Sequence, residues 1–393
     1  MEKIVFISGK RTPFGAFGGS LKDVGAVDLS VVAAKATLEQ ARLSAEHVDH
    51  TILGNVVQSG ADAAYLARHV GLKVGAPVTS GAFMVNRLCG SGFQSWVSAA
   101  QMIKDGEASV ILAGGVEQMS QIPYVMRNVR FGGIRMGPSE LEDAMTSALT
   151  DAYAGIPMAI TAENLGEKYG ITREQSDRYS IQSQARFKQA QAAGKFTDEI
   201  TAVTIESKKG SVTVDKDEHP KPDATYEKIS TMKALFKKDG LVTAATASGI
   251  VDGAAFSLLM SESKAQALKL KPLARIVSYA SVGCDPKIMG IGPAGAARMA
   301  LQRAGLKLEQ MDLVEVNEAF AAQYLSVEKE LKLNPEKTNV NGGAIAVGHP
   351  LGASGTRIMN SLVYELHRRG GKYALGSACI GGGQGIAIII ERL

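Results

Sequence analysis

Cysteine is scarce in this sequence: Cys89, Cys284 and Cys379 are the three present among 393 residues. An odd and sparse set of cysteines argues against a disulfide-stapled fold and is typical of a reducing compartment. The sequence also has no apolar run of signal-peptide or transmembrane length, and its amino terminus leads directly into a short strand-like segment at 4–7. These absences predict a cytoplasmic protein with no membrane partner.

Dense blocks of a single charge are missing as well. The 43 lysines and arginines are spread along the chain beside 39 acidic residues, which gives a net charge of +4. Without a basic stripe we expect no nucleic-acid partner. The six histidines show no ligand-type spacing with one another or with a cysteine pair, so no metal site is expected. Five of them are expected at the surface or at helix caps: His47, His50, His69, His219 and His367.

The chain is long enough for two or three domains. Apolar runs rich in β-branched residues alternate with helical stretches, which predicts an α/β protein with largely buried strands. Helices are expected at 28–41, where Asp28 would be the cap, at 294–303, and from a capping box at Thr172 to a stop at Gly194. The expected strands cover 3–8, 51–58, 109–113, 274–280, 313–316, 373–377 and 386–390.

An internal repeat divides the chain. The segment 43–55 resembles the segment 306–317, and a Val-Asn pair precedes a glycine-rich turn and a helix in both halves. Two matching landmarks in the same order predict a duplicated α/β unit. The expected organisation is a first half at 1–120, an inserted domain at 121–248, a return to the first half at 249–270, and a second half at 271–393.

Cys89 lies between a strand-like apolar run and a Gly-Ser-Gly turn that leads into a helical pattern. Such an elbow places a thiol near a helix amino terminus, where free N–H groups and the helix dipole favour an anion. We therefore expect a lowered thiol pKa and a nucleophilic thiolate at Cys89. A buried structural cysteine is the alternative interpretation of these residues alone.

Three further candidates lie at the ends of expected strands. His349 is surrounded by five glycines and precedes a proline, so its ring is rigidly held and could polarise a carbonyl or pair with a thiolate. Cys379 begins a glycine-rich turn whose amides could bind an oxyanion. Asn317 could act there too, or could simply cap a helix. Because active sites of open parallel α/β sheets form at the carboxyl ends of strands, we expect these residues to converge with Cys89.

Four segments together resemble the motifs of the thiolase family, in the family's order. They are Asn-Arg-Leu-Cys-Gly-Ser-Gly at 86–92, Asn-Glu-Ala-Phe-Ala at 317–321, Gly-Ala-Ile-Ala-Val-Gly-His-Pro-Leu-Gly at 343–352 and Cys-Ile-Gly-Gly-Gly-Gln-Gly at 379–385. The resemblance covers nearly the whole chain, and three other segments look most similar to mitochondrial-type 3-ketoacyl-CoA thiolases. It implies two duplicated βαβαβαββ halves in a five-layered α/β/α/β/α arrangement, with an inserted loop domain that binds coenzyme A.

The resemblance also implies an acyltransferase of fatty acid metabolism. Such an enzyme cleaves a 3-ketoacyl-CoA with CoA and releases acetyl-CoA, or in reverse joins two acetyl-CoA to acetoacetyl-CoA by Claisen condensation. Cys89 would carry the acyl group, Cys379 would move the proton, and His349 would activate Cys89. Asn317 would hold a water of one oxyanion hole, and the amides of Cys89 and Gly381 would form a second. CoA would be a substrate, with no permanently bound cofactor.

The CoA contacts and the assembly follow from the same resemblance. A homodimer or homotetramer is implied. Ala245-Thr246 stand where the family usually has Gly-Asn, which we expect to alter the loop that holds the pantetheine, and Pro157 stands where biosynthetic members often have His. The implied contacts are Met158, Lys221, Phe236, Ala244, Ala247, Ser248, Met289, Ala319 and Phe320.

Other classes of protein stay open on sequence alone. A ketoacyl-synthase-type condensing enzyme would share the fold but would use a single cysteine with two histidines or with His and Asn, so Cys379 argues against it. A non-enzymatic acyl-CoA-binding relative would need neither Cys89 nor His349. A redox pair of Cys89 and Cys379 is a third alternative.

Overall fold

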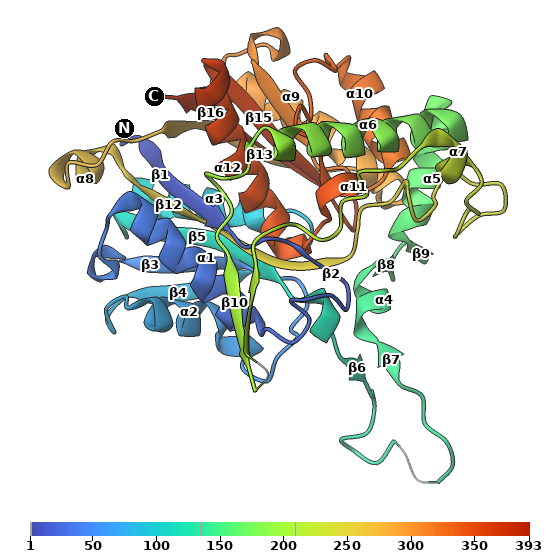
Figure 1. Ribbon diagram of the computed structural model, residues 1–393, viewed down its shortest axis with the longest axis horizontal. Helices are drawn as coiled ribbons and strands as arrows, with labels where there is room; N and C mark the ends of the chain where they lie inside the picture. Colours follow the sequence, from blue (N-terminus) through green and yellow to red (C-terminus); the bar gives the residue numbers. More distant parts are fainter. Residues whose placement is uncertain (1, 134–135, 209) are drawn as a thin grey trace.

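The computed structural model describes residues 2–133, 136–208 and 210–393 (Figure 1). The first half forms a mixed sheet in the order β4-β3-β5-β12-β1, in which β4, β3 and β5 are parallel and β12 is antiparallel to both β5 and β1. The strands are β1 (Ile4–Arg11), β3 (His50–Gly54), β4 (Gly81–Val85), β5 (Val110–Glu117) and β12 (Val251–Ser261).

The second half repeats this pattern. Its order is β14-β15-β16-β13, with β14 parallel to β15 and β16 antiparallel to both of its neighbours. A short antiparallel pairing of β13 with β1, at Val5 and Phe6, joins the sheets of the two halves at one edge. Thr338 forms a parallel bridge to Val314 at the position that β4 occupies in the first half. The duplicated α/β unit predicted from the sequence is confirmed. The strands are β13 (Ala274–Gly283), β14 (Leu313–Val316), β15 (Tyr373–Ile380) and β16 (Gln384–Arg392).

Helices cover both sheets and also fill the space between them. The helices α1 (Ala26–Ala41) and α2 (Leu66–Val74) pack on the outer face of the first sheet, and α9 (Gly292–Ala304) and α10 (Ala321–Leu331) on that of the second. Between the sheets, α3 (Ser91–Lys104) packs against α12 (Leu351–Arg369). The predicted α/β/α/β/α layering is therefore confirmed.

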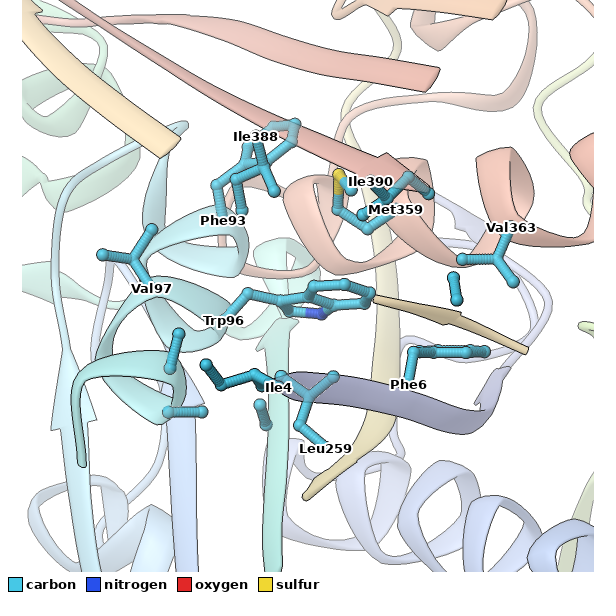
Figure 2. Close-up of a cluster of buried hydrophobic side chains, with 14 of the residues drawn as sticks. Ile4, Phe6, Phe93, Trp96, Val97, Leu259, Met359, Val363, Ile388 and Ile390 are labelled. Atoms are coloured by element: carbon cyan, nitrogen blue, oxygen red, sulfur yellow. The ribbon is translucent and has the colours of Figure 1, made fainter. Parts of the chain in front are cut away.

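The strands bury both faces, and this explains their apolar composition. In β1, Ile4 and Phe6 point into the central core, whereas Val5 and Ile7 point into the outer core under α1. Figure 2 shows the central core around Trp96, whose ring stacks on Phe6 at a centroid distance of 5.5 Å. Side chains from both halves meet there, so the two sheets share one hydrophobic core.

The segment between β5 and β12 crosses the molecule and returns. Its long helix α6 has the predicted capping box at Thr172, and it packs against α10 and α11 of the second half. The fully buried Arg11 of β1 pairs with Glu199 at 2.8 Å and with Asp217 at 2.6 Å, which ties this segment to the first sheet. The elements of the segment are η3 (Met119–Gln121), β6 (Tyr124–Val125), β7 (Glu142–Asp143), α4 (Ala144–Ala148), β8 (Thr150–Asp151), β9 (Ile156–Pro157), α5 (Met158–Tyr169), α6 (Arg173–Ala192), β10 (Val203–Ser207), β11 (Gly210–Val214) and α7 (Tyr226–Ser230).

Two local expectations differ from the structure. Gly25, not Asp28, is the N-cap of α1, because the helix begins two residues earlier than the apolar pattern suggested. Strand β12 was not expected, because it contains a single β-branched residue, Val251, and so has no apolar β-branched run. The remaining short elements are β2 (Gly15–Ala16), η1 (Ala45–His47), η2 (Ala63–Tyr65), α8 (Glu262–Ala267), η4 (Pro286–Ile291), η5 (Leu308–Gln310) and α11 (Ala344–Val347).

No helix within the described ranges is long and apolar enough to cross a membrane.

Glycines allow α3 and α12 to touch backbone to backbone. A Cβ on Gly92 would come within 2.6 Å of the Thr356 nitrogen, and one on Gly355 within 2.2 Å of the Phe93 nitrogen. Neither neighbour is a flexible side chain that could move aside. We therefore expect Gly92→Ala to lower the free energy of unfolding by about 2–3 kcal/mol in chemical denaturation. The control Gly283→Ala, at an exposed position where the nearest contact would be at 3.9 Å, should stay within about 0.5 kcal/mol of the parent.

Candidate active site

Cys89 lies in a tight turn between β4 and α3. Leu88 adopts a positive φ of 47°, a strained conformation for a branched side chain. Hydrogen bonds hold the turn: the Leu88 N–H donates to Asn86 Oδ1 at 3.0 Å, and Ser91 Oγ accepts from the Arg87 N–H at 2.9 Å. The predicted strand–turn–helix elbow is therefore present, and it presents the thiol just before the first turn of α3.

The glycine-rich turn after Cys379 packs directly on this elbow. A Cβ on Gly90 would meet Ile380 at 2.6 Å, and one on Gly381 would meet Leu88 at 3.0 Å, so glycine is what allows the two turns to touch. The backbone N–H of Gly381 donates to the Cys89 thiol. The two halves of the chain thus bring the two predicted reactive cysteines together.

His349 is buried and held through both of its ring nitrogens. Nδ1 lies 2.5 Å from Ser354 Oγ, and Nε2 lies 3.3 Å from Asn317 Nδ2. The Ser354 hydroxyl donates its hydrogen to the Pro350 carbonyl at 3.0 Å, so the serine oxygen accepts from Nδ1–H of His349. In this tautomer Nε2 of the ring has no hydrogen and carries the lone pair. Burial, together with the charge of Arg357, lowers the pKa of His349 to about 3, so the ring is a neutral base.

Asn317 completes this arrangement at the carboxyl end of β14. Its backbone N–H donates to the Ser377 carbonyl at 2.9 Å, which fixes the residue between β14 and β15. Its buried Oδ1 has no hydrogen-bond partner among the described residues. A buried acceptor of this kind is suited to a water or a substrate group, which is the use that the thiolase resemblance implies for Asn317.

Both thiols have raised pKa values, contrary to the lowered value expected for Cys89. Burial raises the pKa of Cys89 to about 11, and the opposing hydrogen bonds from backbone amides, including that of Gly381, do not compensate. Burial also raises the pKa of Cys379 well above its usual value, and the charges of Cys89 and Cys284 add to this effect. The thiols are therefore protonated at rest, and a nearby base must take the proton when one of them reacts.

A cavity of about 560 Å³ reaches His349, whereas Cys89, Asn317 and Cys379 are not among its lining residues. Six of the nine predicted CoA contacts line it: Met158, Phe236, Ala244, Ala247, Ser248 and Phe320.

The other three predicted contacts lie elsewhere. Lys221 lines an adjoining cavity of about 460 Å³, which shares His219 and Ala244 with the first. Met289 and Ala319 line neither cavity and instead pack around Cys379.

Several lining residues were missed by the sequence analysis. His219, expected at the surface or at a helix cap, lies between the two cavities with Nδ1 2.9 Å from the Ala346 carbonyl oxygen. Leu149, Leu235, Ile250 and Leu351 also line the larger cavity. They come from four separate segments. Leu351 lies in the recognised motif at 343–352, which assigned it no role, and the other three lie outside the recognised motifs.

Thr246 stabilises the loop in which the sequence departs from the thiolase pattern. Its hydroxyl accepts from the Thr243 N–H at 2.8 Å and donates to the Leu241 carbonyl at 2.9 Å. The threonine thereby closes the turn with its own side chain, while Ala245 lines the second cavity. The altered loop stays ordered and keeps Ala247 and Ser248 on the cavity wall.

Two cysteines, a neutral histidine and an apolar cavity, set between duplicated α/β halves, define a class of acyl-transferring enzyme. Two family models extend this conclusion: "Thiolase, N-terminal domain" matches residues 4–263 and "Thiolase, C-terminal domain" matches residues 270–392. The chain belongs to the thiolase family. It is an acyltransferase that exchanges acyl groups between 3-ketoacyl-CoA and CoA, with CoA as a substrate.

Relatives match over the whole chain. The mitochondrial 3-ketoacyl-CoA thiolase of Mus musculus is 55% identical over 392 residues, covering 100% of this chain and 99% of the relative. The acetyl-CoA acetyltransferase of Syntrophomonas wolfei is 46% identical over 396 residues, covering 100% of both chains. The crystal structure of human mitochondrial 3-ketoacyl-CoA thiolase in complex with CoA is 56% identical, has a TM-score of 0.97, and is matched over 100% of this chain and 98% of that one. None of these proteins is a ketoacyl synthase or a non-enzymatic binding protein, so those alternatives are not favoured.

The prediction of a cytoplasmic location is contradicted by these relatives, because those named as 3-ketoacyl-CoA thiolases are mitochondrial. The three cysteines are indeed unpaired. Unpaired thiols indicate a reducing environment, however, and do not distinguish one reducing compartment from another.

The contact between Ser354 and His349 sets which ring nitrogen carries the proton. Ser354→Ala would leave Nδ1–H without its acceptor and would favour the tautomer that protonates Nε2. We expect kcat for acetoacetyl-CoA cleavage to fall about 10- to 100-fold, because an unpaired buried N–H costs about 1–3 kcal/mol. The control Ser326→Ala removes a buried serine that donates to a carbonyl of its own helix, away from the site, and should leave kcat unchanged.

Proposed function

We propose that this thiolase acts through an acyl-enzyme on Cys89, with His349 as the base and Cys379 as the second proton carrier. Two observations carry this proposal. The Cys89 elbow packs against the Cys379 turn, and the buried, neutral His349 contacts Asn317, whose backbone bonds to Ser377 on the strand of Cys379. Two protonated thiols and one neutral base, whose Nε2 lone pair faces the Asn317 amide at 3.3 Å, suit a reaction in which protons move as bonds form.

In the cleavage direction, His349 Nε2 takes the Cys89 proton as the sulfur attacks the 3-keto carbon. The carbon–carbon bond breaks, the acyl group stays on Cys89, and acetyl-CoA leaves as its enolate, which Cys379 protonates. The thiol of a CoA molecule then takes the acyl group. Its proton passes to the Cys379 thiolate, and His349 returns its proton to the Cys89 sulfur, which restores all three residues. A water held by Asn317 and the amides of Cys89 and Gly381 are the proposed donors for the charged oxygens, and losing one such donor typically costs about 100- to 1,000-fold in rate.

The CoA molecule is proposed to cross both cavities. Lys221 and Lys228 line the outer one and suit the phosphates, and the apolar lining of the larger one suits the pantetheine and acyl chain. The inserted segment at 121–248, proposed as the CoA-binding domain, contributes lining residues to both cavities. A cavity of about 560 Å³ supports acyl chains longer than that of acetoacetyl-CoA, in keeping with relatives named 3-ketoacyl-CoA thiolase.

The direct experiment is CoA-dependent cleavage of acetoacetyl-CoA and of a longer 3-ketoacyl-CoA, such as 3-ketooctanoyl-CoA. We expect the parent to cleave both. Cys89→Ala should lose at least about 1,000-fold in kcat and form no acyl-protein detectable by mass spectrometry, because it lacks the nucleophile.

Cys379→Ala is the informative comparison. It should still accept an acyl group on its intact Cys89 from an acyl-CoA, although overall cleavage is lost. An acylated Cys89→Ala protein, or full turnover by Cys379→Ala, would contradict the assigned roles. Cleavage of acetoacetyl-CoA alone would contradict the longer-chain substrate while leaving the roles intact.

We also propose that the protein is a homo-oligomer. Strand β4 is the edge of its sheet, with Phe83 exposed, and such an edge suits pairing with a second copy. Figure 1 shows the arm between β6 and β7 extending away from the body. Its apolar side chains Val129, Phe131 and Leu141 are exposed, Phe131 to 96%, and they suit burial against another copy.

Replacing Phe131 tests the arm. We expect the parent to be a tetramer in sedimentation analysis, and Phe131→Glu to shift it towards a dimer, because a buried, unpaired charge opposes association. Val212→Glu, at an exposed apolar residue outside the arm, is the matched control and should not change the mass. A parent that is monomeric at micromolar concentration would contradict the proposal.

A further inference from the structure

Glu117 is a buried carboxylate that lies between the two halves and is not used by the chemistry above. It is the last residue of β5, and its side chain is fully buried. Its Oε1 accepts from the Val57 N–H at 2.9 Å and from Asn55 Nδ2 at 3.3 Å. Its Oε2 accepts from the Val56 N–H at 3.1 Å and from the Gly352 N–H at 2.8 Å.

All four partners of Glu117 are donors. The ionised carboxylate satisfies every one of them, whereas a proton on either oxygen would face another donor. Burial raises the pKa of Glu117 to about 7, although the amides of Val57, Gly352 and Val56 oppose this. Burying a carboxylate costs folding free energy unless hydrogen bonds satisfy its oxygens. The four hydrogen bonds that Glu117 accepts do this, and they join separate segments of the chain.

The partners of Glu117 lead to both reactive turns. Gly352 belongs to the first turn of α12, three residues after His349, and its N–H is one that the helix itself cannot satisfy. On the other side, the Val56 carbonyl accepts from Asn86 Nδ2 at 2.9 Å, and Asn86 Oδ1 accepts from the Leu88 N–H at 3.0 Å, directly before Cys89. The hydrogen bonds therefore run continuously from the Cys89 elbow through Asn86, Val56 and Glu117 to the His349 turn.

We propose that Glu117 is a positioning residue that fixes the His349 turn of the second half relative to the Cys89 elbow of the first. This inference rests on the proposed roles of Cys89 and His349. A single oxygen, Oε2, receives both the Val56 and the Gly352 N–H, so the two turns cannot shift independently while it is ionised. Misplacement of reacting groups by about 1 Å costs on the order of 100-fold in rate, so even a small loosening should be measurable.

The test is a double-mutant cycle on kcat with Glu117→Gln and Asn86→Ala. A glutamine presents an NH₂ to two of the four donors, and the alanine removes the link between Val56 and Leu88. We expect each variant to lower kcat for acetoacetyl-CoA cleavage about 10- to 100-fold while KM changes less than about threefold, because alignment is lost and not substrate affinity. Both substitutions interrupt the same series of hydrogen bonds between the Cys89 elbow and the His349 turn. The kcat of the double variant should therefore be no lower than that of the slower single variant.

Gln118→Ala is the matched control. Gln118 is the next residue, fully buried, and it donates to the Leu21 and Val24 carbonyls outside this connection. We expect it to lower the melting temperature with kcat unchanged. Should Glu117→Gln fail to fold, Glu117→Asp replaces it in the cycle: it keeps the charge but is one methylene too short to reach both turns, and the same fall in kcat is expected.

Wild-type kcat in the Glu117 variant, a change in KM alone, or fully additive losses in the double variant would overturn the positioning role. An inactive parent protein would instead contradict the proposed function, so the two failures are distinguishable.

Discussion

The backbone contact between α3 and α12 is the constraint on which the rest of the structure depends. The two helices cross at Gly92 and Gly355, where a Cβ on either would collide with main-chain nitrogen. Each helix begins directly after one of the reactive turns, so this crossing brings Cys89 and His349 to the same place. The central core around Trp96 and the two covering sheets pack outward from that contact. Larger side chains at the crossing would separate the halves, and the site with them.

Burial at this crossing also determines the chemistry. Packed between the two halves, the thiols lose hydration and hold their protons, and the same loss keeps His349 neutral. The favourable effect of the helix amino terminus on a thiolate is real, but at Cys89 it is smaller than the desolvation cost. At rest the structure therefore has a protonated Cys89 thiol and a neutral His349 ring. Charge develops only during the reaction, where prearranged amide donors stabilise it most effectively.

The elements that the sequence predicted correctly share local signals. Strands β1, β13 and β14, the capping box of α6 and the glycine after α9 follow from apolar runs, caps and stop residues. The fully buried β12 gave no such signal. The site residues show the same difference. The sequence placed the turns of Cys89, Asn317, His349 and Cys379 at strand ends. It did not identify His219, Leu149 and Leu351 as residues that line the cavity.

The sequence by itself determined the duplication, the α/β class and the four reactive turns, because repeats, hydrophobic periodicity and glycine-rich motifs are encoded in consecutive residues. Only the tertiary structure decided the protonation states, the tautomer of His349, the walls of the two cavities and the connection through Glu117. Some of these depend on groups that are distant in the chain, such as the Asn55 side chain and the Gly352 N–H, which both meet Glu117. Others depend on the positions of Ser354 and Arg357 relative to His349. Desolvation and hydrogen bonding act through space, and the order of residues does not specify which distant groups will meet.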